Sequence, residues 1–270
     1  MLKILVIIIT IFLFFFLPQR TSDLGIPEKN EEIVEKRHLF EIHDPIETSV
    51  IEKVLQSKPS TPTSDSDWWK YPSEILECTR NGNNLLVLVN KKYKLPSTYA
   101  PNDLVKVSNS GLRRGENYYL RNILMSDLTN LVNHANADGI DLSIVSGYRS
   151  YQTQVSTYNY WLSKNNNNVE YVDTFSARPG HSQHQLGTAL DFSSNEIGDA
   201  LGDSFANTKA SNWLVENAYK YGFVISFPKG YESVTGYKYE SWHYRYIGVE
   251  NALEMKNSSI ILENYLITKN

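Results

Sequence analysis

Residues 179–192 read Pro-Gly-His-Ser-Gln-His-Gln-Leu-Gly-Thr-Ala-Leu-Asp-Phe, and this stretch decides how the rest of the sequence is interpreted. It places two histidines, an aspartate and two glycines in a short segment, which is more polar than a structural role requires. Imidazole and carboxylate groups are the usual ligands of a catalytic zinc ion. We therefore interpret the stretch as half of a zinc site.

The spacing within this stretch predicts its backbone. His184 and Asp191 would share one face of a helix, but Gly187 and the β-favouring residues 188–192 argue against a helix. On an unbroken strand the two side chains would point to opposite faces. We therefore predict a turn or bulge at Gly187, followed by a strand.

The other half of the site is predicted downstream, where residues 240–243 read Glu-Ser-Trp-His. Glu240 and His243 would face opposite sides of a regular strand, so we expect an irregular backbone near Ser241. With His184 and Asp191, His243 completes a set of two imidazoles and one carboxylate, which leaves a fourth position of zinc open for chemistry. The sequence thus predicts a zinc metallopeptidase.

Peptide hydrolysis at such a site also needs a base and a fixed cation. Glu240 is the candidate base, because it stands next to a predicted ligand and could take a proton from water and return it to the leaving amine. Arg149, within Ser-Gly-Tyr-Arg-Ser at residues 146–150, is the candidate cation, since its planar donor fork suits an oxyanion or a terminal carboxylate. His181 is ranked as a pocket-wall or substrate-contacting residue rather than a ligand.

Each of these residues alone has an ordinary structural explanation. A single histidine is more often a surface or hydrogen-bonded residue than a ligand, and Arg149 could pair with an acid of the fold. These explanations account poorly for the whole combination of His-x6-Asp, Glu-x-x-His and Gly-Tyr-Arg in one domain. The combination therefore favours the catalytic interpretation.

The remaining pattern predicts helices and strands without regular alternation, which is typical of an α+β domain. The helix at residues 119–137 is the clearest, because apolar residues recur at helical spacing and Asp138-Gly139 ends it. We expect a single domain with a central, mainly antiparallel sheet flanked by helices. The predicted elements are strands at 85–89, 142–145 and 223–227 and helices at 119–137, 151–161 and 213–221.

The N-terminal part of the chain predicts a membrane anchor and a spacer. Residues 1–18 hold one charge and a 14-residue apolar run, shorter than the roughly 20 residues of a full membrane span. No cleavage motif follows, so we favour an uncleaved anchor in the cytoplasmic membrane over a cleaved signal that would release a secreted protein. Residues 19–67, charged and poor in aromatics, predict a flexible spacer. The catalytic domain is expected at 68–270, outside the membrane.

Composition narrows the function classes further. The net charge of -4 argues against a general nucleic-acid-binding protein, which would show a basic face. The one cysteine, Cys78, excludes an intramolecular disulfide. A domain of about 190 residues buries about 70% of its unfolded surface, so its core suffices for folding and zinc is free to serve catalysis. No repeats occur, and a monomeric catalytic domain is the default expectation.

Three segments resemble the zinc D-alanyl-D-alanine carboxypeptidases of the VanY type, in the wider group that includes lysostaphin-type enzymes and the hedgehog signalling domain. The resemblance covers roughly residues 85–265, and the combination is far more specific than any one segment. Ser241 stands where many relatives have Pro, which affects the backbone more than the chemistry. The segments are Ser-Gly-Tyr-Arg-Ser at 146–150, Ser-Gln-His-Gln-Leu-Gly-Thr-Ala-Leu-Asp at 182–191 and Glu-Ser-Trp-His-Tyr-Arg-Tyr at 240–246.

The resemblance implies a role for each matching residue. Glu240 would be the catalytic base, and Arg149 would contact the substrate and the transition state. The implied zinc ligands are His184, Asp191 and His243.

The resemblance also implies a substrate, the stem peptide of peptidoglycan. Gln154 and Ser182 would lie near this substrate. Relatives remove a terminal D-alanine after either a D-residue or an L-residue, and the sequence leaves both open. The alternatives are a peptidoglycan endopeptidase of the same fold or a non-catalytic cell-wall or partner-binding module; a full ligand set together with Glu240 argues against the non-catalytic module.

Overall fold

The computed structural model of the chain describes residues 67–270. The predicted anchor at 1–18 and nearly all of the predicted spacer at 19–67 lie outside the described residues. Within residues 67–270, every helix is too short or too polar to cross a bilayer.

A four-stranded antiparallel sheet forms the centre of the described domain, in the order β5-β6-β8-β7. Two smaller sheets accompany it: β1 pairs with β2 in parallel, and β3 pairs with β4 antiparallel. The prediction of an α+β domain with a central antiparallel sheet is confirmed. The strands are β1 Leu76–Glu77, β2 Tyr93–Lys94, β3 Leu104–Lys106, β4 Tyr119–Arg121, β5 Ser143–Ser146, β6 Ala189–Ser193, β7 Phe223–Ile225 and β8 His243–Tyr246.

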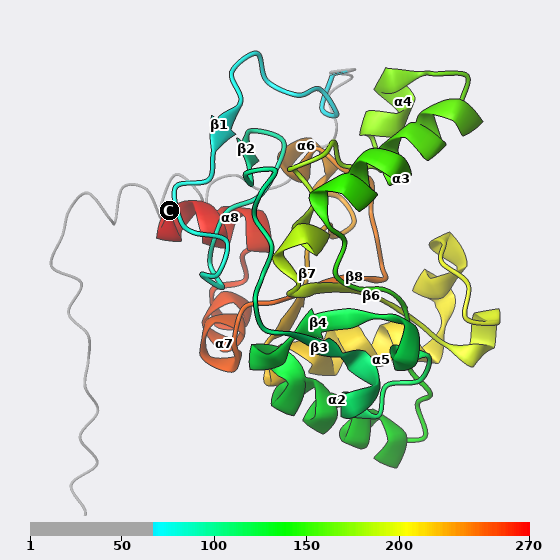
Figure 1. Ribbon diagram of the computed structural model, residues 1–270. Helices are drawn as coiled ribbons and strands as arrows, with labels where there is room; N and C mark the ends of the chain where they lie inside the picture. The colour runs from blue at the N-terminus through cyan, green and yellow to red at the C-terminus, as the bar shows by residue number, and fades with distance from the viewer. Residues whose placement is uncertain (1–66) are drawn as a thin grey trace, which may run out of the picture. The chain divides into compact units, whose positions relative to one another are not determined.

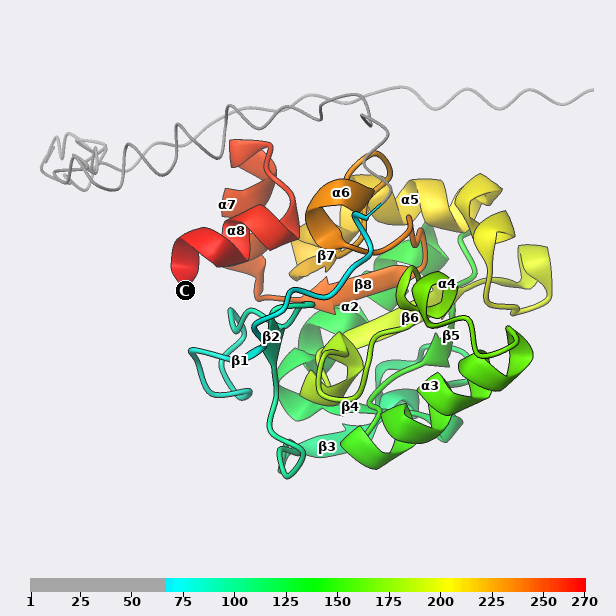
Figure 2. The same ribbon diagram turned by 90° about the horizontal axis from the view of Figure 1, so that it is seen from above.

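Helices cover both faces of this sheet. Figure 1 shows α2 and α5 below the sheet and α3 and α4 above it. In the view from above, α2 lies behind the strands, whereas α4 and α6 lie in front of them (Figure 2). The helices are α2 Met125–Ala137, α3 Tyr151–Lys164, α4 Val169–Asp173, α5 Lys209–Asn217, α6 Glu232–Thr235, α7 Val249–Ser258 and α8 Leu262–Lys269.

Strand β6 has two chemically different faces, because successive side chains alternate. Leu190 and Phe192 are fully buried in the main hydrophobic core with residues of α2 and α5. Asp191, between them, points to the other face and stands directly opposite His243 of β8. The alternation thus places a carboxylate and an imidazole side by side on the face away from the core.

The predicted strand at residues 85–89 is wrong. Val87 and Val89 are buried as an apolar run should be, but the segment forms turns and irregular backbone. The Arg245 guanidinium, fully buried, donates to the carbonyls of Leu85 and Val87 at 2.9 and 2.7 Å. A side chain therefore satisfies the backbone groups that a neighbouring strand would otherwise have paired.

The predicted helix at 119–137 begins later than expected. Residues Tyr119–Arg121 form β4 and pair with β3, and a 3-10 turn precedes α2 at Met125. Tertiary pairing outweighs the helical spacing in this first turn. The other predicted helices and strands occur with shifted ends, and helix 213–221 is divided into α5 and a 3-10 turn that ends at Gly222.

The predicted irregularities on either side of the metal site are confirmed. Gly187 has a φ of 68° and follows the 3-10 helix η4 at Gln183–Leu186. A Cβ at Gly187 would meet Arg121, Leu104 and Pro101 side chains at 3.0 to 3.1 Å, so the turn needs glycine for space as well as for conformation. A turn at residues 241–242 likewise separates Glu240 from β8.

Candidate metal centre and active site

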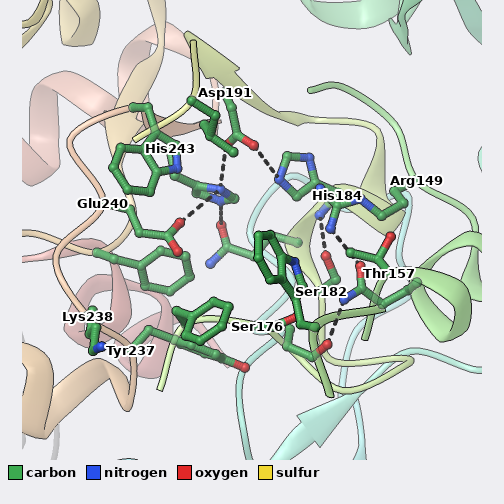
Figure 3. Close-up of a pocket in the computed structure, with 18 of the residues that line it drawn as sticks. Arg149, Thr157, Ser176, Ser182, His184, Asp191, Tyr237, Lys238, Glu240 and His243 are labelled. Atoms are coloured by element: carbon green, nitrogen blue, oxygen red, sulfur yellow. Dashed lines mark hydrogen bonds and ion pairs between the residues drawn. The ribbon is translucent and has the colours of Figure 1, made fainter. Parts of the chain in front are cut away.

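His184, Asp191 and His243 converge on the polar face of the sheet, as predicted (Figure 3). One ligand atom from each lies within 4.8 Å of the others, and all three residues are buried. Asp191 bridges the histidines: Oδ1 is 3.0 Å from His243 Nδ1 and Oδ2 is 3.3 Å from His184 Nε2. We call these three residues the metal cluster.

The second nitrogen of each histidine is engaged by the protein, which orients the ring. His184 Nδ1 lies 2.8 Å from the carbonyl of Gly147, so Nδ1 donates and Nε2 presents its lone pair to the cluster. His243 Nε2 lies 3.3 Å from Gln183 Oε1, so Nδ1 is the nitrogen that faces Asp191. Such orienting contacts fix the tautomer of a metal-binding histidine.

Two of these orienting groups were missed by the sequence reasoning. Gln183 Oε1 also accepts a hydrogen bond from Ser226 Oγ at 2.7 Å, so the amide is fixed before it meets His243. Gly147 contributes only its carbonyl, and a Cβ there would lie 2.8 Å from the carbonyl oxygen of Tyr119. Both residues lie in the quoted segments, within two positions of a predicted site residue, which is the one signal that could have found them.

The donor set fits zinc. Asp191 is buried between two imidazoles whose second nitrogens are engaged by the Gly147 carbonyl and by Gln183 Oε1, so each ring turns a lone pair toward the carboxylate. The cluster therefore offers one carboxylate and two nitrogen lone pairs, all buried and facing a cavity. Three such ligands with an open side are the donor set of a catalytic zinc site.

Glu240 lies beside this cluster without belonging to it. Its Oε2 is 3.7 Å from His243 Nδ1, and its side chain is 13% exposed. Burial raises the pKa of the Glu240 carboxyl well above its usual range, and the charge of Asp191 adds to the shift while Arg149 opposes it. A carboxyl with a raised pKa is suited to hold a proton between two transfer steps.

Arg149 is held by neutral partners. Its Nη1 donates to Gln154 Oε1 at 2.8 Å and its Nη2 donates to Ser146 Oγ at 2.9 Å. The Gln154 amide also donates to the carbonyl of Ala177 at 2.6 Å, so both of its ends are engaged within the protein. No ion pair among residues 67–270 includes Arg149. Its positive charge remains available to an anionic ligand.

Ser182 and His181 line the same cavity as Arg149. Ser182 Oγ accepts from the backbone N–H of His184 at 3.3 Å and thus caps η4. His181 Nδ1 lies 2.8 Å from the carbonyl of Asn90, and its ring meets the edge of Tyr71. His181 is therefore outside the metal cluster.

One cavity of about 410 Å³ brings together all the residues that the sequence singled out. Its lining also includes aromatic side chains and Lys238, which the sequence reasoning did not identify. The predicted residues in its lining are Arg149, Gln154, His181, Ser182, His184, Asp191, Glu240 and His243.

A second cluster of charged groups surrounds a buried aspartate beside this cavity. Asp173 is fully buried, and its carboxylate accepts from Arg178 Nη2 at 2.6 Å and from the Tyr158 hydroxyl at 2.7 Å. Lys91 Nζ donates to the Asp173 carbonyl at 2.7 Å and lies 4.3 Å from the ring centroid of Tyr71. We call these five residues the Asp173 cluster. Each of its charges meets a partner within the protein.

Comparison with known proteins places the chain in a family. The family described as VanY, D-alanyl-D-alanine carboxypeptidase, matches residues 117–249. YodJ of Bacillus subtilis (strain 168), which bears a provisional carboxypeptidase name, is 38% identical over 193 residues, covering 70% of each chain. The chain belongs to the VanY family.

Solved structures of VanY-type enzymes share the fold. The LdcB LD-carboxypeptidase superposes with a TM-score of 0.64 at 33% identity, covering 75% of this chain and 96% of LdcB. A VanY D,D-pentapeptidase mutant in complex with Zn(II) superposes with a TM-score of 0.56 at 30% identity, covering 67% and 98%. Membership of the VanY family makes this chain a carboxypeptidase-type hydrolase, and zinc is the cofactor that the family and the metal cluster indicate.

Proposed function

We propose that this protein is a zinc-dependent carboxypeptidase that removes a C-terminal D-alanine from peptidoglycan stem peptides. The observation that carries the proposal is the single cavity that holds the metal cluster, Glu240 at 3.7 Å from His243, and Arg149 without an acid partner. We further propose, from the sequence, that the domain acts as a monomer outside the cytoplasmic membrane.

In this proposal the metal cluster holds zinc, which would polarise the scissile carbonyl and lower the pKa of water. Glu240 takes a proton from the attacking water and gives it to the leaving amine, as the new C–O bond forms and the C–N bond breaks. Arg149 donates to the C-terminal carboxylate or to the developing oxyanion. Gln154 keeps the guanidinium in place.

The residue before the terminal D-alanine stays open, because the similar structures include an LD-carboxypeptidase and a D,D-pentapeptidase. The test is incubation of the zinc-loaded full chain with a tetrapeptide and a pentapeptide stem, followed by mass spectrometry of released D-alanine. Release from the tetrapeptide alone identifies an L,D-carboxypeptidase, and release from the pentapeptide alone a D,D-carboxypeptidase. Cleavage only of C-terminally blocked peptides would replace the proposal by an endopeptidase.

Glu240→Gln tests the proposed base. Loss of the carboxylate removes proton transfer but no metal ligand, so we expect kcat to fall by about 10²–10⁴-fold with zinc content unchanged. Glu250→Gln is the matched control, because Glu250 is exposed on α7 outside the cavity. Full activity of Glu240→Gln would remove Glu240 from the mechanism.

A further inference from the structure

The cavity extends from the metal cluster to an aromatic wall that the proposed mechanism does not use. We define the aromatic wall as Trp161, Tyr171 and Phe175. Trp161 and Tyr171 each meet Phe175 edge to face with ring centroids 5.4 Å apart, and they are 36% and 46% exposed. The cavity volume of about 410 Å³ lies in the range of sites that enclose a ligand larger than a single alanine. This end of the cavity is therefore available to a more distant part of the substrate.

Lys238 brings a positive charge to the aromatic wall. Its backbone N–H donates to the carbonyl of Thr174 at 2.8 Å, which fixes the residue beside the C-terminal end of α4. Its Nζ lies 4.5 Å from the ring centroid of Tyr171 and 5.9 Å from that of Phe175. The ring faces attract the ammonium but accept no conventional hydrogen bond from it.

No acid of the described domain neutralises this ammonium. The ion pairs found within residues 67–270 do not include Lys238, which is exposed at the rim of the cavity. By contrast, the other lysine held between aromatic rings, Lys91, is buried and donates to the Asp173 carbonyl. Lys238 thus combines a restrained position with free hydrogen-bond donors.

Two cations of the cavity lining, Arg149 and Lys238, have no acid partner among residues 67–270, and they lie on opposite sides of the cavity. Figure 3 shows Arg149 on one side, near His184, and Lys238 on the other side, beyond Glu240 and Tyr237. When the C-terminal carboxylate of a peptide binds Arg149, the part of the peptide that can reach Lys238 is N-terminal to the scissile bond. The charge pattern of the cavity therefore fits a substrate with one carboxylate at its C-terminus and another further along the chain.

We propose that Lys238 binds a second carboxylate of the stem peptide, N-terminal to the scissile bond. This inference rests on the proposed function and adds a substrate preference to it. Stem peptides offer such a carboxylate in two places: on the second residue, a glutamate linked through its γ-carboxyl, and on the third residue where this is diaminopimelate. Amidation removes the charge at either place, so the enzyme distinguishes free-acid stems from amidated stems.

The test compares the zinc-loaded full chain with its Lys238→Gln variant on four synthetic stem peptides containing diaminopimelate. They carry free acids at both positions, an amide at the second, an amide at the third, or amides at both. A rim charge pair is worth about a two- to fivefold change, so the wild type should lose that factor in kcat/KM on the amidated peptide. Lys238→Gln should show the same loss on the free acid and no further loss on the amide. The single amide that reproduces the loss identifies which carboxylate binds.

Two control variants separate charge recognition from packing. Lys238→Arg should retain the preference for the free acid, and Lys229→Gln, at an exposed position outside the cavity lining, should leave it unchanged. Equal losses of Lys238→Gln on free-acid and amidated peptides would overturn the proposal, as would no loss at all.

A binding measurement keeps this test independent of turnover. Zinc-loaded Glu240→Gln, with and without Lys238→Gln, is titrated with the same peptides by calorimetry. Failure of the wild type to release D-alanine from any peptide would refute the proposed function. The affinity difference between acid and amide, present with Lys238 and absent without it, would still decide the role of Lys238.

Discussion

The metal cluster and the Asp173 cluster both bury an aspartate beside the same cavity, but they neutralise it in different ways. Asp173 meets a permanent cation, Arg178, and the Tyr158 hydroxyl, so its charge is balanced by the protein alone. Asp191 meets only two histidines. Both rings already donate their other nitrogen to oxygen acceptors. The protein alone satisfies a buried carboxylate that meets fixed proton donors, whereas a carboxylate that faces imidazole lone pairs is arranged for a metal ion.

Among the changes that test this difference between the two clusters, removal of a metal ligand should have the largest effect on zinc binding and activity. His184→Ala leaves two of the three ligands, so we expect zinc to be lost on dialysis and activity to fall by at least about 10³-fold. Zinc content by mass spectrometry and D-alanine release measure the two effects. A chelator should reproduce the loss in the wild type, and added zinc should reverse it there but not in the variant. A fully zinc-loaded His184→Ala would show that the cluster is not the metal site.

Glu263 of α8 offers a third environment, because this buried acid has neither a metal site nor a paired cation. The Asn90 amide donates to it, and burial raises the pKa of its carboxyl to about 7. Because the folded protein holds the Glu263 proton more tightly than the unfolded chain does, protonation of Glu263 favours folding. This contribution is fully present below the pKa of the unfolded chain and is lost as pH rises through about 7.

The Glu263→Gln variant tests this environment. It should gain stability relative to the wild type between pH 5 and pH 8, by up to on the order of 3 kcal/mol. Urea unfolding at the two pH values measures the difference. Parallel stability curves of the two proteins would contradict the raised pKa.

Asp173→Asn should have the smallest effect. In contrast to His184→Ala, it should change the stability of the fold and not the binding of zinc. The change removes the charge that Arg178 pairs with, but the Arg178 side chain is 41% exposed, so water replaces part of the interaction. We expect a loss of about 1–2 kcal/mol in the free energy of unfolding, with zinc content unchanged. Asp141→Asn, which removes an exposed partner of Arg113, is the matched control and should cost less. Loss of zinc from Asp173→Asn would contradict the conclusion that only the metal cluster is needed for zinc binding.

The sequence predicted the metal cluster well because its chemistry is carried by residue types in short segments. The break at Gly187 followed from the alternation of a strand and from the need to bring His184 and Asp191 to one face. The segment at 85–89 could not be predicted in the same way, because its backbone partner is the guanidinium of Arg245, far away in sequence. Local patterns report which side chains are apolar, but they do not report which distant group satisfies the backbone.

The same reason explains which site residues were missed. Lys238 acquires its place only when α4 and the residues that follow it bring Tyr171 and Phe175 against it, and no spacing in the sequence encodes that contact. Gln154 lines the cavity, and the sequence did not indicate what its amide contacts. Its side chain was expected near the substrate, and both of its ends are engaged, by Arg149 and by the Ala177 carbonyl.

Tyr71 determines where this chain can be truncated or joined to another protein. Its hydroxyl accepts from the backbone N–H of Arg178 at 2.9 Å and lies 3.1 Å from the Tyr237 hydroxyl, and its ring lies against His181. A fragment trimmed to the family match at 117–249 would keep every metal ligand but lose Tyr71, which packs behind the lining residues Tyr237 and His181. A chimera that exchanges the predicted anchor and spacer must therefore be joined upstream of Tyr71, or its catalytic half would carry an intact metal site beside a cavity wall that has lost this support.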